Sequence, residues 1–200
     1  MRAGLYALLS RLLARPMDDE TIAFVRELSG DDSDLGRAVN ALAALARRTT
    51  QVAAAEEFTV LFYGFGAGGE LAPYASQYLT GFVYEKPLAD LRHDLASLGI
   101  GRADEMTEPE DHAAFLCEVM HGLITGTFGR AADLARQQQF FERHLAPWAG
   151  RFFADMEKAK SAALYMPVGT IGRLFMEIER DAFGFGEGDG HGPEAGAARN

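Results

Sequence analysis

Residues 108–112, Glu-Pro-Glu-Asp-His, form the segment of this chain whose side chains could do chemistry. Between Asp104 and Glu118 there are six acidic residues and no lysine or arginine. Carboxylates gathered in this way attract basic groups, and arginine binds them through paired, planar hydrogen bonds. The pattern therefore favours a binding site for a basic peptide.

The same residues also have a purely structural interpretation. Thr107 and Glu110 match a capping box, and acidic residues complement the positive end of a helix dipole. We therefore expect a helix from Thr107 to about Thr125. Asp111 and His112 could instead bond to the preceding loop and hold two halves of the fold together. A histidine that titrates near neutral pH would make peptide binding sensitive to pH.

Two other motifs are weaker. Residues 64–69 match the dinucleotide pattern G-x-G-x-x-G, but a helical segment precedes them where a strand is needed, so a hinge or turn is favoured. Glu118 and His121 have the spacing of a di-iron motif, which requires a second copy that the chain lacks. We therefore predict no metal site and no catalytic residue.

The elements that must position the acidic segment are helices. Apolar residues recur at helical spacing along most of the chain, and no alternating run bounded by turn residues predicts a sheet. The glycine-rich stretch 64–86 interrupts this pattern and predicts a long hinge loop. Helices are expected over 1–14, from Asp18 or Asp19 to Gly30, and over 34–48, 52–63, 87–98, 107–125 and 130–145, with further helices from Pro147 and from about Pro167.

Composition limits the class of protein. The 200 residues are 48% hydrophobic and carry a formal net charge of -10, which argues against nucleic acid as a partner. The single cysteine, Cys117, cannot form an intramolecular disulfide, and no apolar run is long enough to span a bilayer. The first 14 residues have a leucine stripe typical of a docked helix rather than a leader. We expect a cytoplasmic protein with one helical domain over 1–183 and a flexible glycine-rich tail over 184–200.

Three motifs resemble a known family. Residues 57–64, Glu-Phe-Thr-Val-Leu-Phe-Tyr-Gly, 73–78, Pro-Tyr-Ala-Ser-Gln-Tyr, and 108–112 follow in the order seen in the TorD/DmsD/NarJ family of redox-enzyme maturation chaperones. Ala75 departs from the family, which often has an acidic residue or glycine there. The family's C-terminal aromatic pattern is matched by Phe140, His144, Trp148 and Phe152.

The resemblance implies an all-α fold of eight to ten helices around a glycine-rich hinge, without catalytic activity, metal or cofactor of its own. Its implied partners are the twin-arginine signal peptide and the apo catalytic subunit of a molybdopterin oxidoreductase. The chaperone holds the precursor until the cofactor is inserted, before export through the twin-arginine pathway. No nucleic acid or stable membrane association is implied, and the chain would be a monomer or a domain-swapped homodimer. Weak guanine-nucleotide binding has been claimed in the family, but the sequence has no P-loop.

A receptor for such a leader needs an acidic patch beside an apolar groove. We expect Asp111 to be the direct partner of a leader arginine, because arginine prefers bidentate contact with a carboxylate. Tyr74, Ser76 and Tyr78 would line the wall, and the aromatic groove would be formed by Tyr74, Tyr78, Leu79, Phe82 and Tyr84.

The predicted site residues are Tyr74, Ser76, Tyr78, Leu79, Glu108, Pro109, Asp111 and His112. The two tyrosines could alternatively be buried hinge anchors, and Ser76 a helix cap. Two other functions stay open: a helical nucleotide-binding or nucleotide-hydrolysing enzyme that uses Asp111 and His112, and a structural accessory subunit of an anaerobic oxidoreductase. The sequence does not choose among formate dehydrogenase, a sulfoxide or amine-oxide reductase and nitrate reductase as the client.

Overall fold

In the computed structural model, residues 1–64, 68–101 and 108–184 are described, and within these ranges the chain is helical without a strand. The all-α prediction is therefore confirmed. The elements in chain order are α1 (Arg2–Ala14), α2 (Asp19–Arg26), α3 (Asp34–Ala46), α4 (Gln51–Phe58), the π-helix η1 (Thr59–Tyr63), α5 (Ala75–Thr80), α6 (Lys86–Ser97), α7 (Ala113–Thr125), α8 (Leu134–His144), α9 (Ala149–Lys158) and α10 (Met166–Gly184).

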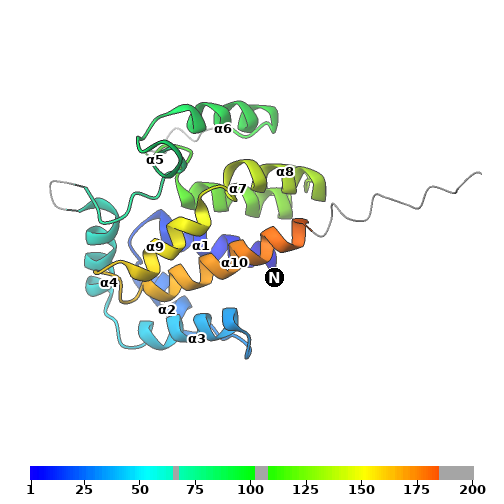
Figure 1. The fold of residues 1–200 in the computed structure, drawn as a ribbon. Helices are drawn as coiled ribbons and strands as arrows, with labels where there is room; N and C mark the ends of the chain where they lie inside the picture. Colours follow the sequence, from blue (N-terminus) through cyan, green and yellow to red (C-terminus); the bar gives the residue numbers. More distant parts are fainter. Residues whose placement is uncertain (65–67, 102–107, 185–200) are drawn as a thin grey trace, which may run out of the picture.

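The centre of the molecule is built from α1, α7, α9 and α10 (Figure 1). α1 packs along α7, and α10 packs along α9 on one side and α3 on another. The leucine stripe of α1 is buried, as predicted for a docked helix, because it faces this core. None of the described helices is long and apolar enough to cross a membrane.

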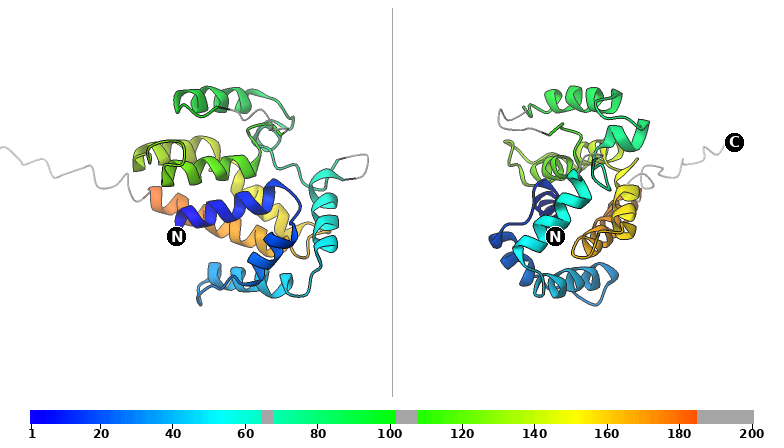
Figure 2. Two further views of the ribbon diagram at one scale, coloured as in Figure 1. Left: turned by 180° about the vertical axis from the view of Figure 1, so that it is seen from behind. Right: turned by 90° about the vertical axis from the view of Figure 1, so that its left-hand side faces the viewer.

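Short helices lie at opposite ends of this centre. α5 and α6 form one end and α2 and α3 the other, with α4 along a side between them (Figures 1 and 2). Side-chain caps fix several helix starts: Asp18, Ser33, Thr50 and Asp133 each accept a backbone N–H of the first turn. We call the described part of the predicted hinge loop, residues 64 and 68–86, the hinge region, and it contains α5.

Several of the predicted boundaries differ from the structure. The helix expected from Thr107 begins at Ala113, because residues 109–112 form a turn, and Thr107 itself lies outside the described residues. The expected loop 64–86 contains α5, which ends at Gly81 with φ +85°. The helix expected over 52–63 changes to π geometry at Thr59. The start of the predicted tail, Gly184, is the last residue of α10, and residues 185–200 lie outside the described part.

Candidate functional site

The start of α5 and the turn before α7 are joined by a short antiparallel bridge between Tyr74 and His112. The Ala75 N–H donates to the Asp111 carbonyl at 3.0 Å, and the Ala113 N–H donates to the Pro73 carbonyl at 2.8 Å. Two of the sequence motifs, 73–78 and 108–112, are therefore in direct contact, as expected if the hinge loop lies against the acidic segment.

Asp111 is fully buried at this joint. One carboxylate oxygen, Oδ2, accepts the Ser76 N–H at 2.8 Å and also the Ser76 hydroxyl. The carboxylate thus caps α5 from a segment 35 residues away in sequence. The expectation that Asp111 meets a leader arginine directly is not met in this structure, because the side chain has no exposed surface. The alternative, in which Asp111 bonds to the preceding loop, describes the observed geometry.

The second oxygen of Asp111 is the unusual feature of the joint. Oδ1 is buried and has no hydrogen-bond partner within the described residues. It belongs to a residue that lines a cavity of about 120 Å³, together with Leu79, Leu116 and His144. A buried acceptor without a donor lowers the stability of the folded protein, and within the described residues Oδ1 of Asp111 is such an acceptor.

His112 caps the next helix. Its Nδ1 accepts the Ala114 N–H at 3.1 Å, which fixes the proton of the neutral ring on Nε2. Burial lowers the pKa of His112 to about 4, although the charges of Glu108 and Asp111 oppose that shift. The imidazole is therefore neutral at physiological pH, and the expected pH sensitivity near neutrality is wrong for this residue. Asp111 and His112 cap two different helices instead of forming a dyad.

Glu108 is the accessible carboxylate of the segment. It is half-buried, and its Oε2 accepts the Tyr74 hydroxyl at 2.5 Å. Burial, and then this hydrogen bond, raise the pKa of Tyr74, while burial and the charge of Glu108 raise the pKa of Tyr63. Two tyrosines thus lie around one negative charge that solvent still reaches.

Glu110 and Pro109 are internal. Glu110 is buried, and the Arg92 guanidinium donates to it in a fork with distances of 2.8–3.1 Å. The buried Pro109 accepts the His112 N–H at 3.1 Å and so closes the turn. Within residues 108–112, the structure therefore leaves only Glu108 as a carboxylate at the surface.

Tyr78 anchors α5 to α9. Its ring lies 5.5 Å from that of Trp148 and 5.9 Å from that of Phe152, both of which are buried. Its hydroxyl donates to Asp155 at 3.1 Å, and burial followed by the charge of Asp155 raises the pKa of Tyr78. Trp148 and Phe152 belong to the C-terminal aromatic pattern, so this pattern supplies the buried rings against which Tyr78 of α5 packs.

From the last turn of α5 onward the chain exposes several apolar side chains, which we call the exposed strip. Its members are Leu79, Phe82, Val83 and Tyr84, with exposed fractions of 40%, 69%, 41% and 69%. Adjacent large apolar side chains at a surface are typical of an interaction site. Tyr84 has φ +64°, a left-handed conformation that is unfavourable for a side chain of this size.

Sequence reasoning missed three residues near the joint: Asp155 of α9, Asp94 of α6 and Arg143 of α8. Asp155 accepts the Tyr78 hydroxyl, and Asp94 bonds the buried His144 at 2.7 Å and Arg143 at 3.0 Å, beside the cavity. Burial lowers the pKa of His144. These residues come from three helices that no motif connects, so no signal in the sequence pointed to their contact.

The remaining motifs have structural contacts. The Glu57 carboxylate accepts the backbone N–H groups of residues 163–165 at 2.8–3.0 Å and so holds the start of α10. His121 contacts the Ala3 carbonyl through Nδ1 at 2.9 Å. No group of three or more potential metal ligands is found in the described part of the chain. Residues 65–67 of the G-x-G-x-x-G match lie outside the described ranges.

The sequence and the fold are similar to those of known proteins. A family model described as nitrate reductase delta subunit matches residues 29–154, more than half of the chain. Chaperone protein TorD of Aliivibrio fischeri is 29% identical over 89% of this chain and 92% of its own length, and that of Vibrio atlanticus is 26% identical over the same shares. The crystal structure of a putative redox enzyme maturation protein from Archaeoglobus fulgidus has the same fold, with a TM-score of 0.59 at 20% identity over 88% of this chain and 94% of that one.

Proposed function

The chain belongs to the nitrate reductase delta subunit family, and from this premise we propose that it is a dedicated chaperone that binds the twin-arginine signal peptide of a molybdopterin oxidoreductase. The chaperone acts in the cytoplasm on the apo catalytic subunit and retains it until the cofactor is inserted. It supplies binding and no bond-making chemistry. The similarity to TorD chaperones along most of the chain supports this assignment.

The observation that carries the proposal is the exposed strip beside the Glu108 carboxylate. A twin-arginine leader presents guanidinium groups followed by an apolar segment, so its receptor needs an accessible acid next to an apolar surface. Phe82 and Tyr84 supply exposed apolar surface, and Glu108 supplies the charge. Tyr84 interacts electrostatically with Tyr74, and the Tyr74 hydroxyl donates to Glu108, so this end of the strip lies on the same side of the molecule as the carboxylate.

The predicted site residues then divide into two roles. Glu108 contacts a leader arginine, and Leu79 with the rest of the exposed strip contacts the apolar segment. Tyr74 and Tyr78 form the wall, since each hydroxyl orients a carboxylate, Glu108 and Asp155 respectively. The buried members position this surface by capping α5 and α7; they are Ser76, Pro109, Asp111 and His112.

The test is calorimetric titration of the full chain with synthetic leaders of the host's molybdoenzymes. Each leader is paired with a version in which the two arginines are lysines and with one in which the apolar segment is scrambled. We expect saturable binding to one leader, about tenfold weaker after the lysine change, because lysine loses the bidentate contact. Scrambling the apolar segment should abolish binding.

Two variants locate the site on the protein. Glu108→Gln and Phe82→Ser should weaken leader binding without lowering the melting temperature, because both side chains reach solvent. The matched controls are Glu27→Gln and Phe24→Ser on the opposite end of the molecule, where side chains of the same type are exposed. Equal affinities for all four variants would contradict the proposed site, and no binding to any leader would contradict the proposed function.

A further inference from the structure

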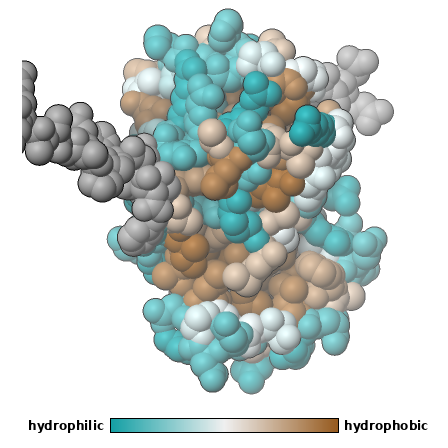
Figure 3. All heavy atoms as spheres, turned by 90° about the vertical axis from the view of Figure 1, so that its right-hand side faces the viewer, coloured by the Kyte–Doolittle hydropathy of each residue, from teal (hydrophilic) through white to brown (hydrophobic). Residues whose placement is uncertain are grey.

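A second pocket lies at the far end of the hinge-side helices. The ends of α6 and α7 and the start of α8 surround a volume of about 370 Å³, on the side of the molecule at which α10 ends. Figure 3 looks at that side and shows apolar surface between polar regions. The pocket shares no lining residue with the cavity at Asp111, so it is separate from the proposed peptide site.

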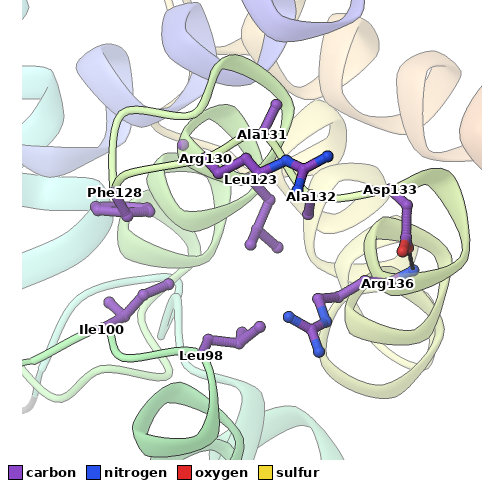
Figure 4. A pocket seen from close by; sticks show the side chains of 10 residues that line it. Leu98, Ile100, Leu123, Phe128, Arg130, Ala131, Ala132, Asp133 and Arg136 are labelled. Carbon is purple, nitrogen blue, oxygen red and sulfur yellow. Dashed lines mark hydrogen bonds between the residues drawn. The ribbon is translucent and has the colours of Figure 1, made fainter.

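Two arginines line one part of this pocket. The Arg130 side chain comes from the loop after α7 and the Arg136 side chain from α8, and the guanidinium of Arg136 points away from its helix into the pocket (Figure 4). Both residues are exposed, and neither guanidinium has a hydrogen bond or ion pair with another described residue. The nearby Asp133 carboxylate caps α8 by accepting the Arg136 backbone N–H at 2.9 Å. In a chain of net charge -10, two such cations beside one pocket are an exception to the overall charge.

The other part of the pocket is apolar. Ile100 and Phe128 lie away from the guanidinium groups, while Leu98 lies beside that of Arg136 and Leu123 points into the middle of the pocket (Figure 4). Gly122 of α7 makes room for the Phe128 ring, since a Cβ at Gly122 would lie 2.0 Å from a ring carbon. Phe128 therefore packs flat on the helix and forms a wall that a larger residue at 122 would displace.

We propose that this pocket binds a small organic anion. A carboxylate or phosphate group is held by Arg130 and Arg136, and a compact apolar group attached to it lies against Leu98, Ile100 and Phe128. Guanidinium groups bind either kind of anion through paired hydrogen bonds. A volume of a few hundred Å³ with apolar walls and a few polar groups is typical of small-molecule sites. The inference is independent of signal-peptide binding.

The test is a titration of the ¹⁵N-labelled full chain, followed by backbone amide shifts. Phenyl phosphate and benzoate represent the two kinds of anion, and inorganic phosphate and phenol represent the two halves of the ligand. We expect shifts that saturate and cluster at Gly122 and residues 128–136 for phenyl phosphate, benzoate or both. Inorganic phosphate should bind at least about tenfold more weakly, because it lacks the apolar contact.

Variants separate this site from general attraction of anions. Arg130→Gln and Arg136→Gln should each weaken binding about tenfold, with folding confirmed by circular dichroism. Arg48→Gln is the matched control, since Arg48 is also exposed and without a side-chain partner in the described part of the chain but lies beyond α3. Equal weakening by all three variants, no saturable binding of either aromatic anion, or equal affinity for inorganic phosphate would overturn the proposal.

Discussion

Two carboxylates are fully buried, Glu179 in the core and Asp111 at the hinge region, and they differ in how many of their oxygens accept a hydrogen bond. Both oxygens of Glu179 are bonded: Arg2 donates from Nε at 2.7 Å and Nη2 at 2.8 Å, and the Tyr6 hydroxyl donates at 2.9 Å. Asp111 has donors from Ser76 on one oxygen and none within the described residues on the other. By the donors that the described residues supply, we call the Glu179 contacts the closed joint and the Asp111 contacts the incomplete joint.

The difference indicates what each region is built for. A satisfied buried ion pair fixes the relative position of α1 and α10, on which the rest of the fold packs. A buried acceptor that has no donor costs about 1–3 kcal/mol, and no described residue donates to Oδ1 of Asp111, which lies next to the surface where we place the peptide. The contacts of the described residues therefore hold Glu179 more completely than Asp111, and local stability commonly differs in this way between the core and a binding region.

The largest effect is expected in the closed joint. Arg2→Met leaves Glu179 buried with the Tyr6 hydroxyl as its remaining donor, and loss of one partner of a buried pair typically costs 3–5 kcal/mol. Because the Arg2 side chain is 34% exposed and therefore partly screened, we expect the lower end, about 3 kcal/mol. Urea denaturation with an unchanged m-value would measure the loss.

The control for this prediction is Arg11→Met on the same helix. Arg11 pairs with Glu20, whose side chain is 85% exposed, so the loss should stay within about 1 kcal/mol. Similar losses for the two variants would mean that the closed joint contributes no more than a surface pair.

Acid should weaken the hinge region through His112. Its pKa is about 4 in the folded protein and 6.5 as a free side chain. Between these values the unfolded chain binds the proton and the folded chain does not, so stability falls as pH decreases from 6.5 toward 4. The loss at pH 5 is about 2 kcal/mol. Unfolding free energies measured at pH 7 and pH 5 should show this difference in the wild type.

His112→Asn removes the titrating ring but keeps a side chain that caps helices well. This variant should lose about 2 kcal/mol less than the wild type between pH 7 and pH 5. Because His144 is present in both proteins, its own titration cancels in the comparison. Parallel pH profiles would show that His112 is not the group responsible.

A smaller effect is expected from Asp111→Asn. The side-chain oxygen of asparagine can still accept both Ser76 donors, and its amide group replaces an oxygen that has no partner among the described residues. We expect a loss of about 1 kcal/mol, the difference between a charged and a neutral acceptor. The same isosteric change at Glu179 faces Arg2 and Tyr6 and should cost at least twice as much. Equal losses in urea denaturation would remove the distinction between the closed and the incomplete joint.

The sequence was sufficient to predict most of the helices and the contact between the two motifs. Apolar periodicity located α1 and α3 to within two residues at either end, and the capping residue Asp18 located the start of α2. The turn before α7 was missed because Thr107 and Glu110 match a capping box, although the helix is capped by His112. A local signal was outweighed by the bridge from Tyr74 to His112, which depends on tertiary contact.

Burial was the part of the site that the sequence did not provide. The acids of residues 108–112 look equivalent in sequence, yet Glu110 pairs with Arg92 and Asp111 caps α5, while Glu108 stays accessible. The partners come from α5 and α6, and no spacing rule connects them to the segment. Residue types predicted an acidic site, but tertiary structure decided which acid faces solvent.

The smallest effect is expected from a substitution at Tyr84, which should raise stability and weaken leader binding at the same time. Tyr84 is 69% exposed and has φ +64°, a conformation that asparagine adopts more readily than a large aromatic residue. Tyr84→Asn should therefore raise the free energy of unfolding by about 0.5 kcal/mol, while it removes an aromatic side chain from the exposed strip and weakens leader binding. Phe82→Asn is the matched variant, because it removes an equally exposed ring at a position without positive φ and should weaken binding with no gain in stability. If Tyr84→Asn lowers stability, the strained backbone is maintained by contacts of the tyrosine itself; if it leaves leader affinity unchanged, Tyr84 does not belong to the binding surface.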